Sequence, residues 1–141
     1  MITEKNGTFC LETENTSYLF EIMETGHPEH LYYGRKIRFR DTAALREKHP
    51  FAGGNTNYYD AAHKNLGLED VCLEMSAYGK GDIREPFLEV VHADGSFTSD
   101  FLYDSFEITE TKQEQETELL LPGSYSEDGR VEHLCVRLRD K

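Results

Sequence analysis

The sequence predicts an all-β protein, an antiparallel β-sandwich, and three observations support this prediction. Apolar and polar residues alternate with a period of two in several short runs, as in Val131–Asp140. Turn signals such as Asp94-Gly95 separate these runs at short intervals. A single short stretch favours a helix. About ten short strands with almost no helix are typical of two packed sheets.

Length and composition favour one soluble globular unit. The chain has 141 residues, of which 38% are hydrophobic and 30% charged. This length is enough to bury one core, so we expect a single β-sandwich domain over residues 1–141. The 15 basic and 27 acidic residues give a formal net charge of −12. Such a field repels phosphate backbones and anionic lipid, so nucleic acid and membranes are not expected as partners.

Cysteine usage and the absence of targeting signals in this sequence favour a cytoplasmic location. Cys10, Cys72 and Cys135 are widely spaced, and each lies in an apolar, strand-like run. An odd number in such positions favours buried, reduced thiols over a metal site or a disulfide framework. The first residues contain no apolar run like that of a signal peptide, and no stretch approaches the length of a membrane span.

The first third of the chain predicts an antiparallel meander. Gly7–Thr13 reads as a strand, and Ser17–Met23 follows it with Tyr18, Phe20 and Ile22 on one face. The Gly26-His27-Pro28 break then allows residues 29–33 to return as a hairpin partner.

The next stretch predicts one more strand and the one helix. Arg35–Arg40 is the main basic cluster, and its period of two would place Ile37 and Phe39 inward. Its outward basic residues suit a solvated strand face better than an anion site, because no glycine loop or aromatic platform accompanies them. Ala43–Lys48 is the helix candidate, which Asp41 or Thr42 would cap and Pro50 would end.

Residues 51–65 have no periodicity and predict a long loop. Loops of this length in compact domains are often functional or disordered. The adjacent Tyr58 and Tyr59 offer aromatic faces that can pack on a sugar ring, and the nearby polar side chains can bind its hydroxyl groups. The candidate sugar-binding residues of this loop are Asn55, Asn57 and Asp60.

A tight turn after this loop carries the most distinctive motif. An apolar strand-like segment, residues 71–75, leads into Tyr78-Gly79-Lys80-Gly81-Asp82. Gly79 and Gly81 permit positive φ on both sides of one residue, so the chain can reverse sharply. Asp82 and Arg84 then lie on the same face of an extended chain. They can either pair to fix the turn or offer a polar contact to a partner, and the structural pair is the better-supported alternative.

The second half predicts more strands. Phe87–Ala93 and Ser96–Tyr103 are expected to form a hairpin around the Asp94-Gly95 turn. Asp104–Glu110 continues this long strand, with a bend or a change of sheet midway. Val131–Asp140 is the final strand, with Leu134 on one face and Cys135 on the other.

No constellation of residues indicates catalysis. His27 and His30 have a spacing that metals sometimes use, but Pro28 implies a turn and no third ligand is nearby, so no metal is expected. The sequence carries no nucleophile elbow and no phosphate loop. Carboxylates are plentiful, yet spacing alone does not place two of them across a glycosidic bond. We therefore assign no catalytic residue and no cofactor.

Five pieces of sequence, in order, resemble the amino-terminal β-domain of the glycoside hydrolase family 36 α-galactosidases, and together they span nearly the whole chain. They are Ser17-Tyr18 with Gly26, His30-Leu31-Tyr32-Tyr33-Gly34, Tyr78-Gly79-Lys80-Gly81-Asp82-Ile83-Arg84-Glu85-Pro86, Asp94-Gly95-Ser96 with Asp100-Phe101-Leu102-Tyr103, and Leu121-Pro122-Gly123-Ser124-Tyr125.

The resemblance implies part of a galactose-mutarotase-like supersandwich and a chain that is an amino-terminal fragment of a longer glycoside hydrolase. In this family the catalytic carboxylates that hydrolyse terminal α-galactosides, with retention, lie on a following barrel domain. This chain alone is then inactive, and its partners are that downstream catalytic domain, the α-galactoside held by the full-length enzyme, and further copies in a homo-oligomer.

The resemblance also implies one substrate contact. In the family, a basic residue before an aromatic-Ser-Leu-Asp run can reach a neighbouring protomer's active site. Here Lys64 stands where arginine is usual, while Leu66 replaces the aromatic residue and Glu69 the aspartate. Lys64 is thus the residue of this run expected to bind substrate.

Two hypotheses follow. The chain is either the non-catalytic amino-terminal domain of an α-galactosidase, which supports oligomerisation and shapes the sugar pocket, or a free-standing β-sandwich that binds carbohydrate or protein through residues 51–65. A barrel encoded downstream of Lys141 would favour the first, and a stop codon the second.

Overall fold

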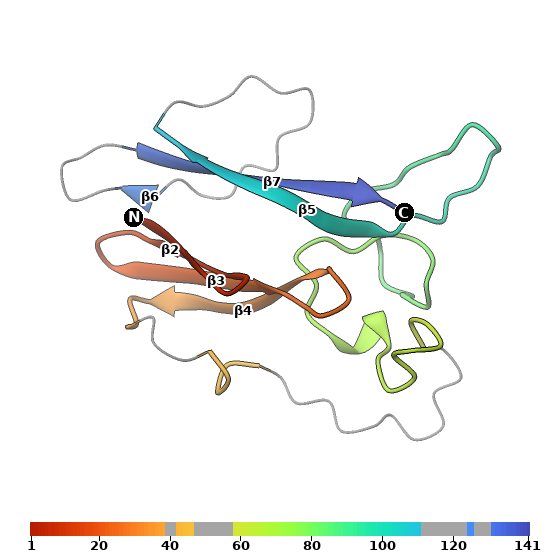
Figure 1. Ribbon diagram of the computed structural model, residues 1–141, viewed down its shortest axis with the longest axis horizontal. Coiled ribbons are helices and arrows are strands. Elements are labelled where there is room, and N and C mark those ends of the chain that lie inside the picture. Colours follow the sequence, from red (N-terminus) through yellow and green to blue (C-terminus); the bar gives the residue numbers. More distant parts are fainter. Residues whose placement is uncertain (39–41, 47–57, 111–123, 126–130) are drawn as a thin grey trace.

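The computed structural model describes residues 1–38, 42–46, 58–110, 124–125 and 131–141. Two antiparallel sheets lie one above the other as layers (Figure 1). The strand order is β1-β2-β3-β4 in the first sheet and β5-β7-β6 in the second. The predicted antiparallel β-sandwich is confirmed. No helix among the described residues is long and apolar enough to cross a membrane.

The first sheet is a meander of four consecutive strands. A β1–β2 hairpin begins it, although no strand was expected before Gly7. Asn6 and Gly7 both have positive φ, 53° and 77°, which is the geometry of a tight two-residue hairpin turn. The Asn-Gly pair was therefore the signal for the missed strand. The four strands are β1 (Ile2–Lys5), β2 (Thr8–Glu12), β3 (Thr16–Ile22) and β4 (Pro28–Arg35).

The second sheet is built around the last strand of the chain. Its members are β5 (Phe101–Thr109), β6 (Ser124–Tyr125) and β7 (Val131–Asp140). β7 lies between the other two, and its bounds are those that the period of two predicted. The register between β5 and β7 shifts between Tyr103 and Ser105. This irregularity falls inside the long strand for which a bend was expected.

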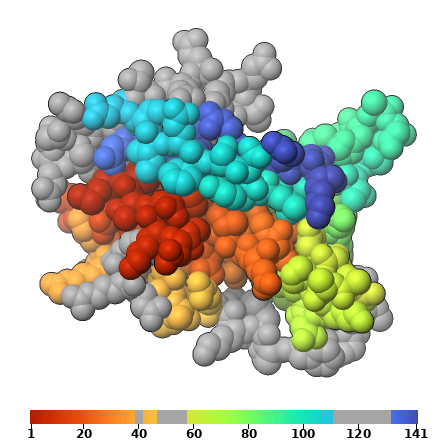
Figure 2. Space-filling view, in the orientation of Figure 1, coloured from red at the N-terminus to blue at the C-terminus, as the bar shows by residue number. Residues whose placement is uncertain are grey.

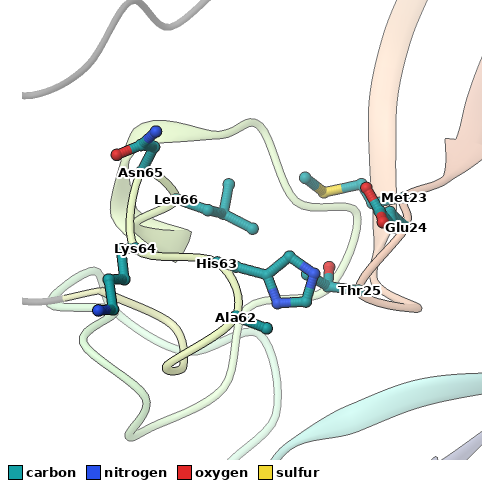
Figure 3. Close-up of a pocket in the computed structure, with 8 residues that line it drawn as sticks. All are labelled: Met23, Glu24, Thr25, Ala62, His63, Lys64, Asn65 and Leu66. Carbon is teal, nitrogen blue, oxygen red and sulfur yellow. The ribbon is translucent and has the colours of Figure 1, made fainter.

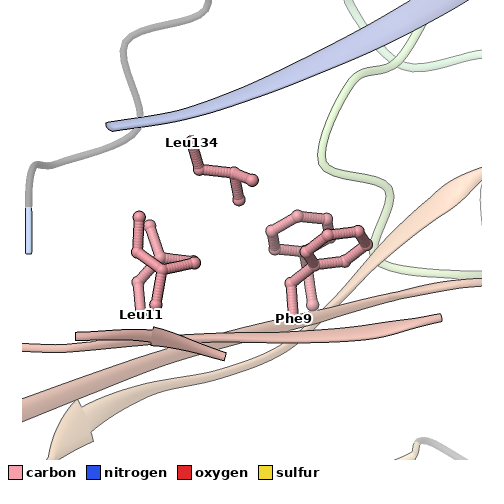
Figure 4. Close-up of a cluster of buried hydrophobic side chains, with 5 residues drawn as sticks. Phe9, Leu11 and Leu134 are labelled. Atoms are coloured by element: carbon pink, nitrogen blue, oxygen red, sulfur yellow. The ribbon is translucent and has the colours of Figure 1, made fainter. Parts of the chain in front are cut away.

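The core fills the space between the two sheets (Figure 4). Phe9 and Phe20 stack with ring centroids 4.7 Å apart, and Phe106 of the second sheet meets Phe9 edge-on at 5.0 Å. Leu134 reaches down from β7 toward this pair and Leu11. Burial of Phe9, Phe20, Leu11 and Leu134 is what joins the two layers.

The outer face of the first sheet is also covered. Cys10 and Leu19 pair across β2 and β3 on the face opposite the core, and each is about 1% exposed. Residues 42–46 account for part of this cover, because the Arg46 guanidinium binds the buried Glu21 carboxylate at 2.5 and 2.6 Å. Burial raises the pKa of the Cys10 thiol to about 11, so this cysteine stays protonated.

Two sequence predictions in the first half need correction. β4 ends at Arg35, so Ile37 does not continue a strand; Phe39 and Arg40 lie outside the described residues. In the described part of the helix candidate Ala43–Lys48, residues 43–45 form a turn, closed by the Leu45 amide on the Thr42 carbonyl at 2.8 Å; residues 47 and 48 lie outside the described residues. Burial of Thr42 and the ion pair of Arg46 favour this compact turn over a helix.

The segment between the sheets also differs from the prediction. Residues 71–75 form no strand beyond an isolated bridge from Leu73 to Glu29, and a 3₁₀ helix, η1 (Leu68–Asp70), precedes them. The Asp94-Gly95 turn is present, with Gly95 at φ 84°, but the flanking hairpin of strands is absent. Cys72 is exposed and outside any strand and Cys135 is half-buried, so the expected burial of the three thiols holds for Cys10 alone.

We predict that the inter-sheet contact of Leu134 is a main source of stability. Leu134→Ala should lower the free energy of unfolding by about 2–5 kcal/mol, because it opens a cavity between the layers. Urea denaturation measures this cost. Ile83→Ala is the matched control, since Ile83 is 81% exposed and its truncation should change stability by less than about 0.5 kcal/mol. Equal effects of the two substitutions would contradict a shared core.

Candidate functional site

The candidate site lies in the irregular connection between the two sheets. Residues 58–100 contain Lys64, Asp60 and the whole glycine turn, but no extended strand. Two buried carboxylates, Asp82 and Asp100, organise this connection through their hydrogen bonds. Loops that are held in this way on a rigid sheet commonly carry binding residues.

The glycine turn adopts the expected reversal. Gly79, Lys80 and Gly81 have φ values of 101°, 53° and 85°. The Asp82 amide donates to the Gly79 carbonyl at 3.1 Å and closes the turn. A Cβ added at Gly79 would lie 2.4 Å from a methyl carbon of Thr98, so close packing as well as backbone geometry requires glycine there. Tyr78, at the start of the turn, is exposed, and its carbonyl accepts the Ser99 amide at 2.9 Å.

Asp82 and Arg84 form the expected ion pair, and Arg84 also binds two backbone carbonyls. Its Nε and Nη2 donate to the two carboxylate oxygens of Asp82 at 2.9 and 2.8 Å. Nη1 and Nη2 also donate to the carbonyls of Val71 and Leu68, at 2.6 and 2.8 Å. Leu68 begins η1 and Val71 follows its end, and their carbonyls also accept the backbone amides of Val71 and Leu73, at 3.5 and 3.1 Å. The ion pair thus ties the glycine turn to the preceding helix.

This arrangement also keeps Asp82 ionised. Burial by itself would raise the pKa of Asp82, but hydrogen bonds from the Arg84 side chain and backbone, together with the guanidinium charge, hold it below its usual value. The carboxylate side chain is 1% exposed and that of Arg84 is 37% exposed. The pair is therefore intermediate between a surface and a buried salt bridge.

Asp100 is the second organising carboxylate, and it joins more distant segments. It lies just before β5, and its side chain is 2% exposed. His27 Nε2 lies 3.0 Å from Oδ1, the Tyr59 hydroxyl donates to Oδ2 at 3.0 Å, and Lys80 Nζ lies 3.7 Å from Oδ2. Burial would raise the pKa of Asp100, but these neighbours hold it below its usual value.

The Asp100 carboxylate also fixes the tautomer of His27. An ionised carboxylate can only accept, so Nε2 carries the hydrogen. In the neutral ring Nδ1 is then the acceptor for the Thr25 hydroxyl, which lies 2.9 Å away. His27 thereby links the β3–β4 turn to the start of β5.

Tyr59 is buried and serves structure instead of offering a sugar platform. Its hydroxyl binds Asp100, its ring meets His27 edge-on at 5.0 Å, and Lys80 Nζ lies 5.9 Å from its centroid. Burial, followed by the bond to Asp100, raises the pKa of Tyr59 to about 12. Tyr58, by contrast, is 49% exposed.

Lys64 lines an open pocket of about 280 Å³ between the β3–β4 turn and residues 62–66 (Figure 3). His63 and Leu66 point toward the Met23–Thr25 side of this pocket. The Lys64 side chain extends to the other side of the loop, away from Thr25. Its ammonium is therefore presented outward.

The other sugar-binding candidates have different positions. One oxygen of Asp60, Oδ1, accepts from the amides of Ala62 and His63 at 2.9 and 2.8 Å and lies 2.7 Å from His63 Nδ1. Asp60 therefore shapes its own loop. Asn55 and Asn57 lie outside the described residues. A role for these three residues in sugar binding stays a prediction.

The two histidines of the 27–30 spacing have separate carboxylate partners. His27 binds Asp100, whereas His30 Nδ1 lies 2.8 Å from Glu74, which also accepts the Tyr18 hydroxyl. Among the described residues no group of three or more histidine, cysteine or acidic side chains has metal-binding geometry. The pairing of His27 with Asp100, 73 residues apart in sequence, could not be read from spacing.

Comparisons with known proteins converge on one family. A family model described as the glycosyl hydrolase family 36 N-terminal domain matches residues 26–141. Over 139 residues the chain is 27% identical to the α-galactosidase Mel36A of Lactobacillus acidophilus, covering 98% of this chain and 18% of that protein. Over 133 residues it is 26% identical to the bifunctional α-galactosidase/sucrose kinase AgaSK of Mediterraneibacter gnavus, covering 94% of this chain and 14% of that protein.

Solved structures agree with this result. An α-galactosidase from Lactobacillus brevis matches 95% of this chain and 18% of its own with a TM-score of 0.75 and 26% identity. The α-galactosidase AgaB of Geobacillus stearothermophilus matches 99% of this chain and 18% of its own, with a TM-score of 0.75 and 23% identity. The chain thus spans less than a fifth of the relatives it matches.

We predict that loss of Asp82 destabilises the chain, because it leaves the Arg84 guanidinium without its charged partner. Asp82→Ala should lower the free energy of unfolding at neutral pH by about 2 kcal/mol, between the values for exposed and buried pairs. Urea denaturation measures this, with Glu89→Ala as the control at an exposed carboxylate. Unchanged stability of Asp82→Ala would show that the motif does not stabilise the turn.

The same pair predicts a pH dependence. The pKa of Asp82 is lower in the folded chain than its unperturbed value of 3.8, so its contribution is present above that pH. It is lost as the pH falls through the lower, folded value. The difference in stability between wild type and Asp82→Ala should therefore shrink on acidification below about pH 4. A difference that stays constant down to the acid transition would contradict this.

Proposed function

Because this chain belongs to the glycosyl hydrolase family 36 N-terminal domain family, we propose that it is the non-catalytic amino-terminal domain of a longer α-galactosidase. The observation that carries the proposal is the coverage: 98% of the chain aligns with Mel36A of L. acidophilus, yet this is 18% of that α-galactosidase. In this proposal residues 1–141 form one β-sandwich domain, and a downstream domain cleaves terminal α-galactosides.

The arrangement of carboxylates supports a non-catalytic role. Retaining hydrolysis uses two carboxyl groups about 5–5.5 Å apart on either side of the scissile bond. Glu24 is the one carboxylate among the residues that line the pocket. The buried carboxylates of Glu21, Asp82 and Asp100 are bound to Arg46, Arg84 and the His27–Tyr59 pair respectively. Hydrogen bonds within the fold already occupy these three groups.

Lys64 supplies the proposed contribution to a sugar pocket. Its ammonium carries three donors, and it is presented outward from a loop that lies on the sandwich surface. Its N–H groups can donate hydrogen bonds to the hydroxyl oxygens of a sugar in the active site of a neighbouring protomer. This contact with a neighbouring protomer requires a homo-oligomer, and the homo-oligomer is therefore part of the proposal.

The surface of the inter-sheet connection supports association. Ile83, Phe87 and Val91 are 81%, 62% and 61% exposed, which is unusual for large apolar side chains that lie close together in sequence. Residues 85–98 project from the body of the molecule (Figure 2). A projecting apolar segment is suited to contact with another domain or another copy of the chain.

We predict that the isolated 141-residue chain does not release nitrophenol from a nitrophenyl α-galactoside. It lacks the domain on which the proposal places the nucleophile and the acid, whereas the full-length protein should be active. A pure sample with measurable turnover, abolished by substitution of a carboxylate, would overturn the non-catalytic assignment.

We also predict that the isolated chain self-associates at moderate salt. Repulsion from a net charge of −12 opposes association at low salt, but it is screened beyond about 10 Å at 0.1 M. Apolar contact over an interface of about 1,600 Å² outweighs the remaining repulsion. Sedimentation should show a dimer or larger species that strengthens with salt. A strict monomer at high concentration, in both low and high salt, would contradict this.

A further inference from the structure

The loop that carries Lys64 is closed by its own backbone. The Tyr59 amide donates to the Leu66 carbonyl at 2.8 Å, and the Leu66 amide to the His63 carbonyl at 3.1 Å. The His63 amide donates to the Asp60 carbonyl at 3.2 Å. These bonds join residues of the loop to one another, so they give the loop its shape but not its place on the sandwich.

The Tyr59 side chain holds this loop at its position on the sandwich. It is 8% exposed at the base of the loop, and it contacts three segments that are distant in sequence. Its hydroxyl binds Asp100 at 3.0 Å, its ring packs against His27 of the β3–β4 turn, and Lys80 of the glycine turn lies over its face. The loop is therefore attached where these segments meet.

Asp100 is in turn fixed to the second sheet. Its amide donates to Asp140 Oδ1 at 2.7 Å, and its carbonyl accepts the Lys141 amide at 3.2 Å. Asp140 is the last residue of β7, and Asp100 directly precedes β5. The bond from Tyr59 to Asp100 thus connects the Lys64 loop to the sheet by one buried, charge-assisted contact.

We propose that Tyr59 and Asp100 are positioning residues, which hold the Lys64 loop in one place so that its ammonium meets the sugar without prior reorganisation. This inference rests on the proposed function of Lys64. Both side chains are buried, so they act through the loop and not by touching the sugar. Fixing the loop in advance removes the ordering cost that a mobile lysine would incur on binding.

The first test measures the loop itself, by amide hydrogen exchange in the full-length protein that carries this chain. Tyr59→Phe keeps the ring and its packing but removes the hydroxyl that binds Asp100. Exchange of the amides of residues 59–66 should become about tenfold faster, because a hydrogen bond to a buried charged group is lost. Tyr58→Phe removes a hydroxyl from the adjacent, half-exposed tyrosine and should leave this exchange unchanged.

The second test separates binding from chemistry in the same full-length protein. Lys64→Ala should raise KM for a nitrophenyl α-galactoside severalfold with little change in kcat, and Tyr59→Phe should do the same to a smaller extent. The double variant should be no worse than Lys64→Ala alone, because both changes act through one ammonium group.

The outcomes of the two tests distinguish the anchoring of the loop by Tyr59 from the sugar contact of Lys64. Loop exchange that is the same in Tyr59→Phe and wild type overturns the positioning role, whatever the kinetics. Faster exchange with a KM that Lys64→Ala does not alter supports the anchoring of the loop by Tyr59 and refutes the sugar contact of Lys64. Asp100→Asn keeps the size of the side chain and provides a second variant. Amide hydrogen exchange in the Lys64 loop must also become faster in this variant.

Discussion

The buried carboxylate of Asp100 is the constraint on which the arrangement of this chain depends. A charge that is 2% exposed is costly unless it is paired, so each of its oxygens needs donors from the surrounding fold. His27 of the β3–β4 turn and Tyr59 of the Lys64 loop form hydrogen bonds with the carboxylate, and the ammonium of Lys80 in the glycine turn lies 3.7 Å from it. No two of these segments are neighbours in sequence. Because all three contact the one Asp100 carboxylate, this carboxylate holds them against the second sheet.

Side chains also take over the role that a ladder of backbone hydrogen bonds has in the sheets. The Arg84 guanidinium binds the carbonyls of Leu68 and Val71 at 2.8 and 2.6 Å. Ser76 Oγ donates to the Glu85 carbonyl at 3.1 Å and accepts the Phe87 amide at 3.0 Å. Backbone groups outside the sheets also need partners, and here polar side chains supply some of them without a strand. This explains how the connection keeps a defined shape while leaving apolar side chains on its surface.

Sequence reasoning succeeded where the signal was local. The period of two gave the bounds of Val131–Asp140, and the glycines of the 78–82 turn gave its reversal and the Asp82–Arg84 pair. It failed where distant groups decided the outcome. Val71 and Leu73 look like part of a strand, but Arg84 binds the carbonyl of Val71 and one isolated bridge replaces the ladder.

The candidate site could be predicted less well than the fold, because its contacts join residues that are distant in sequence. Asp100 was noticed as part of a run that resembles a family, but its partners are 41 and 73 residues away and have no characteristic spacing. Tyr59 was expected to present its ring to a sugar, and its burial depends on those partners. Lys64 is a prediction that rests on the resemblance, because a lone lysine in a polar loop carries no signal of its own.

The position of β7 has a consequence for how the protein forms during synthesis. The four strands of the first sheet are consecutive, so their pairings are local and can close early. The second sheet cannot assemble until its central strand, β7, which follows β5 and β6 in sequence, leaves the ribosome. Until then the core face of the first sheet, with Phe9, Leu11 and Phe20, has no cover from Leu134. The nascent chain therefore passes through a stage with an exposed apolar sheet, which is when chaperone binding would matter most.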